Sequence, residues 1–162
     1  MAGLALAAAA VAKVALGSTA VQAISLGAAI IWHGFSPSGM TKSGTQSFTT
    51  SWALLAGWLA NTGTYPGSTV VSNALQVQGS KPDATIAVSL PYSSTFSNNR
   101  RARIKVNGTV VATSAGFTAN SGTIEVTATG VAVADGDDIT IEVIMETYAS
   151  GSISAGGTVT VT

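Results

Sequence analysis

The chain has 162 residues and a formal net charge of zero, with 46% hydrophobic and only 9% charged residues. This balance excludes the strongly basic surface of a nucleic-acid or anionic-membrane binder, and the absence of cysteine excludes disulfides, thiolate metal sites and cysteine nucleophiles. A weakly charged chain rich in Ser, Thr and Gly is typical of a part that is buried in, or repeated across, a larger assembly.

The first twelve residues, MAGLALAAAAVA, form an apolar segment with two interpretations. One is a secretion signal cleaved after residues 21–23, Val-Gln-Ala. The other, which we favour, is an Ala-rich arm packed against neighbouring chains, because no Lys or Arg precedes the apolar run and Lys13 interrupts it. A membrane span is not expected, since polar residues break any stretch of about 20 apolar residues. The sequence leaves open whether this arm is helical or extended.

A short phrase occurs twice within residues 13–32: Val-Ala-Leu-Gly at residues 14–17 returns as Ile-Ser-Leu-Gly at residues 24–27. Each copy has an apolar run, a Leu-Gly pair, small residues and a second apolar run, which predicts strand, tight turn and strand. Two copies predict a meander of three short strands. Such a ribbon is marginal alone in water, so we predict that its large apolar residues form an assembly interface. These residues are Val14, Leu16, Val21, Ile24, Leu26, Ile30, Ile31 and Trp32.

Gly, Ser and Pro dominate residues 35–45, which indicates a linker. The chain is therefore predicted to consist of an Ala-rich arm and ribbon over residues 1–34, this linker, and an all-β domain over residues 46–162. The frequent turns and short strands of the domain favour an antiparallel β-sandwich of jelly-roll or immunoglobulin-like type.

Alternating apolar residues predict the strands of the domain. Residues 48–58 fit one strand with Phe48 and Trp58 on a shared face; a helix is the alternative, but Gly57 argues against it. Asn107-Gly108 predicts a tight hairpin. Its expected core-facing residues are Ile104, Val106, Val110 and Ala112. Further strands are predicted at residues 70–77, 85–90, 123–127, 139–143 and 158–162.

Residues that could support chemistry are few. His33 is the only histidine, and no Gly-x-Ser-x-Gly nucleophile motif accompanies it. Asp135, Asp137 and Asp138 could bind a hard cation, but they lack the other ligands of a calcium loop, and Asp-Gly is a common turn pair. We therefore predict no catalytic, cofactor-binding or metal-binding residue, and no enzymatic activity.

Two further groups have competing interpretations. Arg100, Arg101, Arg103 and Lys105 lack the interleaved aromatic residues of a nucleic-acid groove, so we predict a solvated strand face that pairs with acids. The candidate acids are Glu125, Glu142 and Glu146. Four aromatic residues could form a sugar-binding platform, although core packing is the favoured role. They are Trp52, Trp58, Tyr65 and Tyr92.

The repeat at residues 13–32, KVALGSTAV…ISLGAAIIW, resembles the ribbon that opens many small virion proteins of tailed bacteriophages, especially phages of actinobacteria. Most of these are minor tail proteins, in which a Gly/Ser/Pro linker and an all-β domain follow the ribbon. The matching residues are Lys13, Leu16, Gly17, Ser18, Thr19, Val21, Ile24, Leu26, Gly27 and Trp32. The chain departs from the pattern where Ala28-Ala29 replaces a more usual polar pair, and where the Ala-rich segment precedes the ribbon.

The resemblance implies a minor tail protein in the virion, which assembles through its ribbon and displays the sandwich. Its expected partners are copies of itself, as a homotrimer by analogy with phage fibres and tips, and other virion proteins of the tail or capsid. A host cell-surface glycan is a further candidate partner; nucleic acid and membrane are not. One alternative is a capsid decoration protein that stabilises the head. Another, of a different class, is a secreted carbohydrate-binding module.

Overall fold

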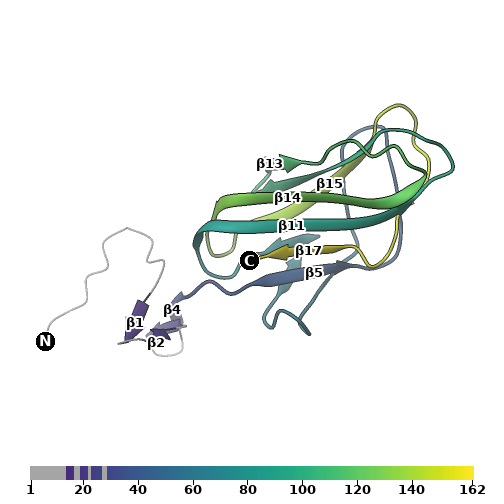
Figure 1. Ribbon diagram of the computed structural model, residues 1–162. Coiled ribbons are helices and arrows are strands. Elements are labelled where there is room, and N and C mark those ends of the chain that lie inside the picture. The colour runs from purple at the N-terminus through teal and green to yellow at the C-terminus, as the bar shows by residue number, and fades with distance from the viewer. Residues whose placement is uncertain (1–13, 17–18, 22, 27–28) are drawn as a thin grey trace, which may run out of the picture.

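The computed structural model describes residues 14–16, 19–21, 23–26 and 29–162. Throughout these ranges the chain is all-β, and every pair of strands is antiparallel. The described residues contain no helix that is long and apolar enough to cross a membrane. Two sheets pack face to face as a β-sandwich, which confirms the predicted fold class (Figure 1).

One sheet is built around the long strand β11, which pairs with β14 on one side and with β17 and β16 on the other. β17 pairs with β5, β5 pairs with β8, and β16 pairs with β6. The strands of this sheet are β5 (Ser38–Lys42), β6 (Gln46–Ser47), β8 (Trp58–Ala60), β11 (Lys81–Ser93), β14 (Ser121–Val133), β16 (Ser152–Ile153) and β17 (Thr158–Val161).

The second sheet has the order β13, β12, β15, β10, β9, and β7 pairs with β15 beside β10. Its strands are β7 (Ala53–Leu54), β9 (Thr69–Val71), β10 (Ala74–Gln76), β12 (Arg100–Val106), β13 (Thr109–Thr113) and β15 (Asp138–Met145).

The core lies between the two sheets and follows the alternation of the sequence. In β11, Ile86, Val88 and Leu90 are buried while the residues between them are half-buried. In β15, Ile139, Ile141 and Val143 are fully buried, as their spacing predicted. Alternate residues of a strand point to opposite faces of a sheet, so these strands each give one row of side chains to the same hydrophobic core.

The predicted hairpin is present between β12 and β13. Asn107 and Gly108 both have positive φ, 48° and 80°, as a two-residue turn of type I′ requires. The prediction that Val110 faces the core is wrong, because it is exposed. Ile104 lies opposite Ala112, but Lys105 lies opposite Val110. This β-bulge leaves one extra residue in β13 and turns Val110 to the outside.

The predicted linker over residues 35–45 is wrong in its centre, because residues 38–42 form β5 inside the first sheet. Small residues allow this burial: a Cβ on Gly39 would lie 2.6 Å from the Tyr65 ring, so only glycine fits there. Lys42 is also buried, which lowers the pKa of its ammonium, and its Nζ donates to the carbonyl oxygens of Ser43 and Gly44 at 2.6 and 3.0 Å. The sandwich therefore begins by residue 38.

The single strand predicted over residues 48–58 is also wrong. The segment contains β7 and the start of β8, with Gly57 at a φ of 74° between them. Phe48, Leu55 and Trp58 are buried, and the Trp58 indole donates to the Leu55 carbonyl at 2.8 Å. The positive φ at Gly57 ends the extended conformation, so the chain enters the core as a loop.

The N-terminal segment forms two hairpins where we predicted a three-stranded meander. Among the described residues, β1 (Val14–Leu16) pairs with β2 (Thr19–Val21) alone, and β3 (Ala23–Leu26) pairs with β4 (Ala29–His33) alone. Each hairpin carries one copy of the repeated phrase. Each therefore closes on itself, and β2 forms no ladder with β3 within the described residues.

Candidate functional site

Three connections gather at the end of the sandwich opposite β1, β2 and β4 (Figure 1). They are the loops 94–99, 114–120 and 146–151, and we call this end the tip. Backbone hydrogen bonds join them: Ser94 N donates to Asn120 O at 2.7 Å, and Glu146 N donates to Asn99 O at 3.0 Å. Arg100 and Phe117 exchange two backbone bonds of 3.0 and 2.9 Å. The three loops thus form one hydrogen-bonded unit.

Arg100 lies beneath these loops and is fully buried, with 0% of its surface exposed. Its Nη1 donates to the carbonyl oxygens of Asn98 and Ala119 at 3.0 and 2.7 Å, with a longer contact to that of Phe117. Its Nη2 donates to Phe96 O at 2.5 Å. The guanidinium therefore holds two of the loops together through their backbones. The prediction of a solvated Arg100 is wrong.

Aromatic rings pack around this cation from below. The Arg100 guanidinium carbon lies 5.0 Å from the centre of the Tyr92 ring and 6.0 Å from that of Phe48. A guanidinium over an aromatic face is attracted by the negative charge density of the ring. Because backbone carbonyls and ring faces supply the surroundings, the cation is stabilised without an acid among the partners described.

Two exposed aromatic side chains, Phe96 and Tyr148, meet on the outer surface of the tip. Phe96 is 55% exposed and Tyr148 is 47% exposed. Their ring centres are 5.8 Å apart and their planes are inclined at 78°, an edge-to-face contact. The Asn98 amide donates to Tyr148 O at 3.0 Å and so ties the loop of one ring to that of the other.

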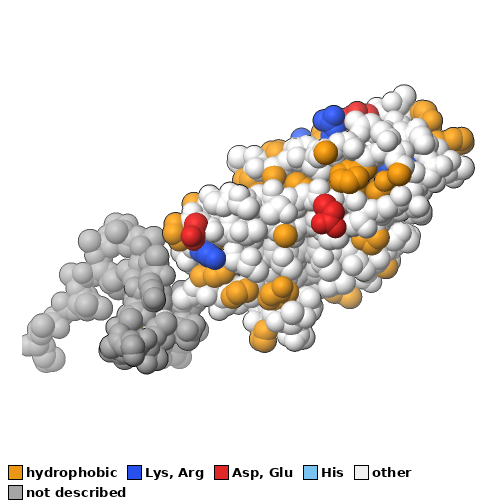
Figure 2. Space-filling model, viewed as in Figure 1, with side chains coloured by type: hydrophobic (Ala, Val, Ile, Leu, Met, Phe, Trp, Pro, Cys, Tyr) orange, Lys and Arg blue, Asp and Glu red, His pale blue; other side chains and the backbone are white. Residues whose placement is uncertain are grey.

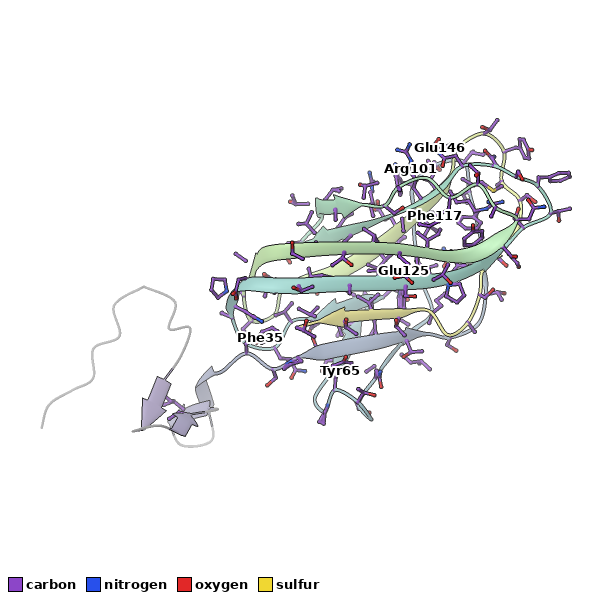
Figure 3. All side chains as sticks on the ribbon, viewed as in Figure 1. Phe35, Tyr65, Arg101, Phe117, Glu125 and Glu146 are labelled. Atoms are coloured by element: carbon purple, nitrogen blue, oxygen red, sulfur yellow. The ribbon has the colours of Figure 1, made fainter. Side chains whose placement is uncertain are left out.

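The remaining side chains of the tip are almost all uncharged. Ser97 Oγ donates to the Asn120 amide oxygen at 3.1 Å, and Ser94 Oγ donates to Phe96 O at 3.1 Å. The one acid in these loops, Glu146, forms an ion pair with Arg101 at 3.1 Å and accepts from the Asn99 amide at 2.6 Å. Arg101 and Glu146 point toward each other on this end of the molecule (Figure 3).

Three of the four basic residues of β12 pair with acids, as predicted: Arg101 with Glu146, just after β15, and the other two with Glu142 of β15. Arg103 and Lys105 both bind Glu142, with Lys105 Nζ 3.0 Å from Oε1 and Arg103 Nε 2.6 Å from Oε2. Trp52 covers this group, its ring centre 4.4 Å from the Arg103 guanidinium. Glu125 instead accepts from the Ser89 hydroxyl at 3.0 Å. Burial alone would raise the pKa of the Glu142 carboxyl, but the hydrogen bonds and charges of Lys105 and Arg103 outweigh it and lower that pKa.

Replacing Glu142 with Gln is expected to lower the free energy of unfolding by about 1–2 kcal/mol at pH 7. A lowered pKa in the folded state stabilises the fold above the ordinary value of about 4.3, and this contribution disappears as the pH falls through the folded pKa. The difference between wild type and E142Q should therefore shrink between pH 7 and pH 3 in urea unfolding. Glu125→Gln, at an exposed acid bonded to one serine, is the control. An equal E142Q effect at both pH values would contradict the assignment.

The four aromatic residues considered for a sugar platform do not share a surface. Trp58 and Tyr92 belong to the hydrophobic core, which confirms the favoured role for these two. Trp52 lies on Arg103, and Tyr65 lies beside Gly39. The sequence analysis did not predict the exposed aromatic pair at the tip, Phe96 and Tyr148. Its signal was a lone aromatic residue within each of two loops that otherwise contain, apart from Glu146, only Ser, Thr, Asn and small residues.

The carboxylates of the acidic turn accept hydrogen bonds from two backbone N–H groups and two side-chain amides. Asp137 accepts from Ala134 N and from the Asn107 amide, both at 2.7 Å. Asp135 accepts from Gly79 N at 2.9 Å, and Asp138 accepts from the Gln76 amide at 3.2 Å. Among the described residues, no three His, Cys, Asp or Glu side chains are grouped to hold a metal ion. The turn therefore fits a role in joining β10, β14 and the hairpin of β12.

A hollow of about 360 Å³ lies beside this turn, at the end of the sandwich that faces the hairpins. It is mainly apolar and is lined by Ser80, Lys81, Pro82, Ala132, Val133, Ala134 and Asp137. Phe35 lies next to it, with its ring centre 5.2 Å from Lys81 Nζ. Backbone bridges between Gly34 and Ser80 and between Ser36 and Gln78 attach the chain to the sandwich here.

The predicted assembly residues lie on the four strands of the two hairpins. Of their side chains the structure describes two, Val21 and Ile24, and both are half-buried. The side chains of the other six, and that of His33 at the end of β4, lie outside the described residues. The Ala-rich arm of residues 1–12 lies outside them as well.

Comparisons with known proteins give a likeness of fold alone. No family model matches the sequence, and neither does any curated protein. The sandwich is similar to the Eiger TNF structure from S. frugiperda, with a TM-score of 0.59 at 9% identity over 78% of this chain and 90% of that one. Two carbohydrate-binding modules show weaker likenesses, each over 78% of this chain. They are the CBM36-1 domain of a multidomain xylanase from the hindgut metagenome of Trinervitermes trinervoides (TM-score 0.39, 13% identity, 96% of that chain) and a family 35 carbohydrate binding module from Clostridium thermocellum (TM-score 0.37, 15% identity, 97% of that chain).

Proposed function

We propose that this protein is a non-enzymatic structural component of a tailed-phage virion, a minor tail protein that assembles through residues 1–34 and displays its sandwich. One observation carries the proposal. The two copies of the repeated phrase form separate hairpins that take no part in the ladders of the sandwich within the described residues. This pairing supports a role for the segment with the phage-like sequence that is separate from the role of the sandwich.

Elementary energetics explains why such a segment needs partners. Strands of three to five residues in two-stranded sheets are marginal in water unless another surface covers them. The repeat nevertheless carries eight large apolar residues, and burying each contributes roughly 1.5–3 kcal/mol. Neighbouring copies in a symmetric oligomer can bury such residues repeatedly. A homotrimer is the proposed copy number, with other virion proteins as further partners.

The surface of the sandwich is consistent with a part held in an assembly. Figure 2 shows a face on which red and blue side chains are sparse and orange ones are scattered among uncharged polar groups. Only 9% of the residues are charged. A protein that remains soluble by itself usually carries more charge than this, whereas a virion part is held at a fixed position and needs less.

The same observation fits a capsid decoration protein, so the position in the particle needs its own experiment. Antibodies raised against the sandwich are expected to label the tail of intact particles in electron microscopy, and quantitative mass spectrometry should find few copies per particle. Labelling of the head with copies in proportion to the major capsid protein would favour the decoration role. Complete absence of the protein from purified particles would overturn the virion proposal.

A further inference from the structure

We propose that the tip binds a neutral saccharide through Phe96 and Tyr148. The choice of a host-surface glycan as the natural ligand rests on the proposed function, whereas the saccharide chemistry rests on the tip alone. The tip lies at the end of the sandwich away from the hairpins (Figure 1), so in an assembly built through the hairpins it is the end that is displayed.

Phe96 and Tyr148 both expose their rings to solvent. About half of each ring-bearing side chain faces solvent, 55% for Phe96 and 47% for Tyr148, although aromatic residues are usually buried when a core can take them. A sugar ring presents weakly positive C–H groups on one face, and these match the negative face of an aromatic ring. Since the two rings stand at 78°, they offer surfaces in two directions, which suits a chain of sugars better than a flat ligand.

Hydroxyl and amide side chains surround the two rings. The loop 94–99 reads Ser-Thr-Phe-Ser-Asn-Asn, and the loop 146–151 adds a threonine and a serine. Hydroxyl and amide groups both donate and accept hydrogen bonds, as the hydroxyls of a sugar do. The single acid is already neutralised by Arg101, and the buried Arg100 is directed at backbone carbonyls. Because the one surface ion pair is balanced and Arg100 is fully buried, these loops present no unpaired charged side chain at their surface, which suits a neutral ligand.

Hydrogen bonds between the loops make the tip rigid. Arg100 fixes the Phe96 carbonyl, Asn98 fixes the Tyr148 carbonyl, and Ser97 joins Asn120 across loops. Ordering flexible loops weakens binding, so loops that are already ordered favour it. The other large apolar residues that are exposed within the described part of the chain lack this setting, because all are aliphatic and lie on strands. They are Leu54, Leu59, Val71, Val110 and Val111.

The test uses the full chain in affinity electrophoresis with defined polymers. Dextran, mannan, arabinogalactan and soluble chitin oligomers are the neutral probes, and heparin and hyaluronate are the anionic ones. We expect retardation by at least one neutral probe, and at least a tenfold loss of affinity, about 1.4 kcal/mol, in the F96A/Y148A double variant. Leu59→Ala, at a residue 61% exposed on β8, should bind as wild type does, and all variants should melt alike because these side chains lie on the surface.

Three outcomes would overturn the inference: no retardation by any neutral probe, retardation by the anionic probes alone, or equal binding by the double variant. Self-association that the double variant loses would assign the tip to contact between copies instead. None of these outcomes bears on residues 1–34, whose role in assembly is measured separately by deletion. Failure of the saccharide inference is therefore distinguishable from failure of the virion proposal.

Discussion

Replacing Arg100 with Met is expected to lower the free energy of unfolding by about 3–5 kcal/mol. Methionine retains an apolar stem between Tyr92 and Phe48 but removes every donor, so the carbonyls of Phe96, Asn98 and Ala119 lose their partner in a buried place. An unsatisfied buried acceptor costs about 1–3 kcal/mol. Urea unfolding followed by circular dichroism measures the loss, and hydrogen exchange should quicken first in the loop 94–99.

Arg101 offers a matched control one residue away. Its side chain is 42% exposed, and its ion pair with Glu146 lies on the surface. Exposed pairs contribute between zero and about 1 kcal/mol, so Arg101→Met should be nearly neutral. Equal destabilisation by the two substitutions would mean that the buried guanidinium does not organise the tip.

The parts of the fold that sequence predicted are those in which local pattern and tertiary structure agree. Ile139, Ile141 and Val143 alternate with polar residues, and they are buried as that period requires. Asn107-Gly108 is favoured in a type I′ turn by backbone sterics alone. At such positions the neighbours along the chain contain the necessary information.

The errors arose where distant residues decide the structure. The segment 38–42 has linker composition, yet its small residues are what allow β5 to fit beside Tyr65 and β17. Val110 is turned outward by a bulge that the alternating pattern does not reveal. Arg100 has the same residue type as its neighbours Arg101 and Arg103, and it is buried because loops 94–99 and 114–120 fold over it.

The candidate site shows the same division. Four aromatic residues were weighed as a sugar platform against the favoured role of core packing, and Trp58 and Tyr92 confirm that favoured role. Phe96 and Tyr148 are 52 positions apart, as their residue numbers show, and only the folded chain brings their rings together. A search for aromatic residues isolated in Ser/Asn-rich loops would have selected both, although it could not have paired them.

Deletion of residues 1–34 is expected to abolish assembly and leave the sandwich folded. The buried core of the described residues runs from Met40 to Val161, and β5 begins at Ser38, so the deletion removes no strand of either sheet. It does remove the bridge between Gly34 and Ser80, but the Ser36–Gln78 bridge remains. The eight large apolar side chains of the repeat, to which we attribute the drive to associate, are lost together.

Substitutions in the full chain test whether the repeat, and not the remainder of residues 1–34, is responsible for the oligomer. Leu16→Asp with Leu26→Asp in the full chain places a charge in each copy of the repeat, and should dissociate the oligomer as the deletion does. Leu59→Asp, on an exposed residue of β8, is the control and should leave the oligomer intact. Dissociation by the control alone would assign the interface to the sandwich.

Multi-angle light scattering of the full chain and of residues 35–162, with circular dichroism of both, tests the assembly role most directly. We predict an oligomer, a trimer by our proposal, for the full chain, and a folded monomer with an intact β-sheet spectrum for the truncated one. A truncated chain that remains fully oligomeric would show that the sandwich holds the assembly together. A truncated chain that unfolds would show that residues 1–34 belong to the core of the domain.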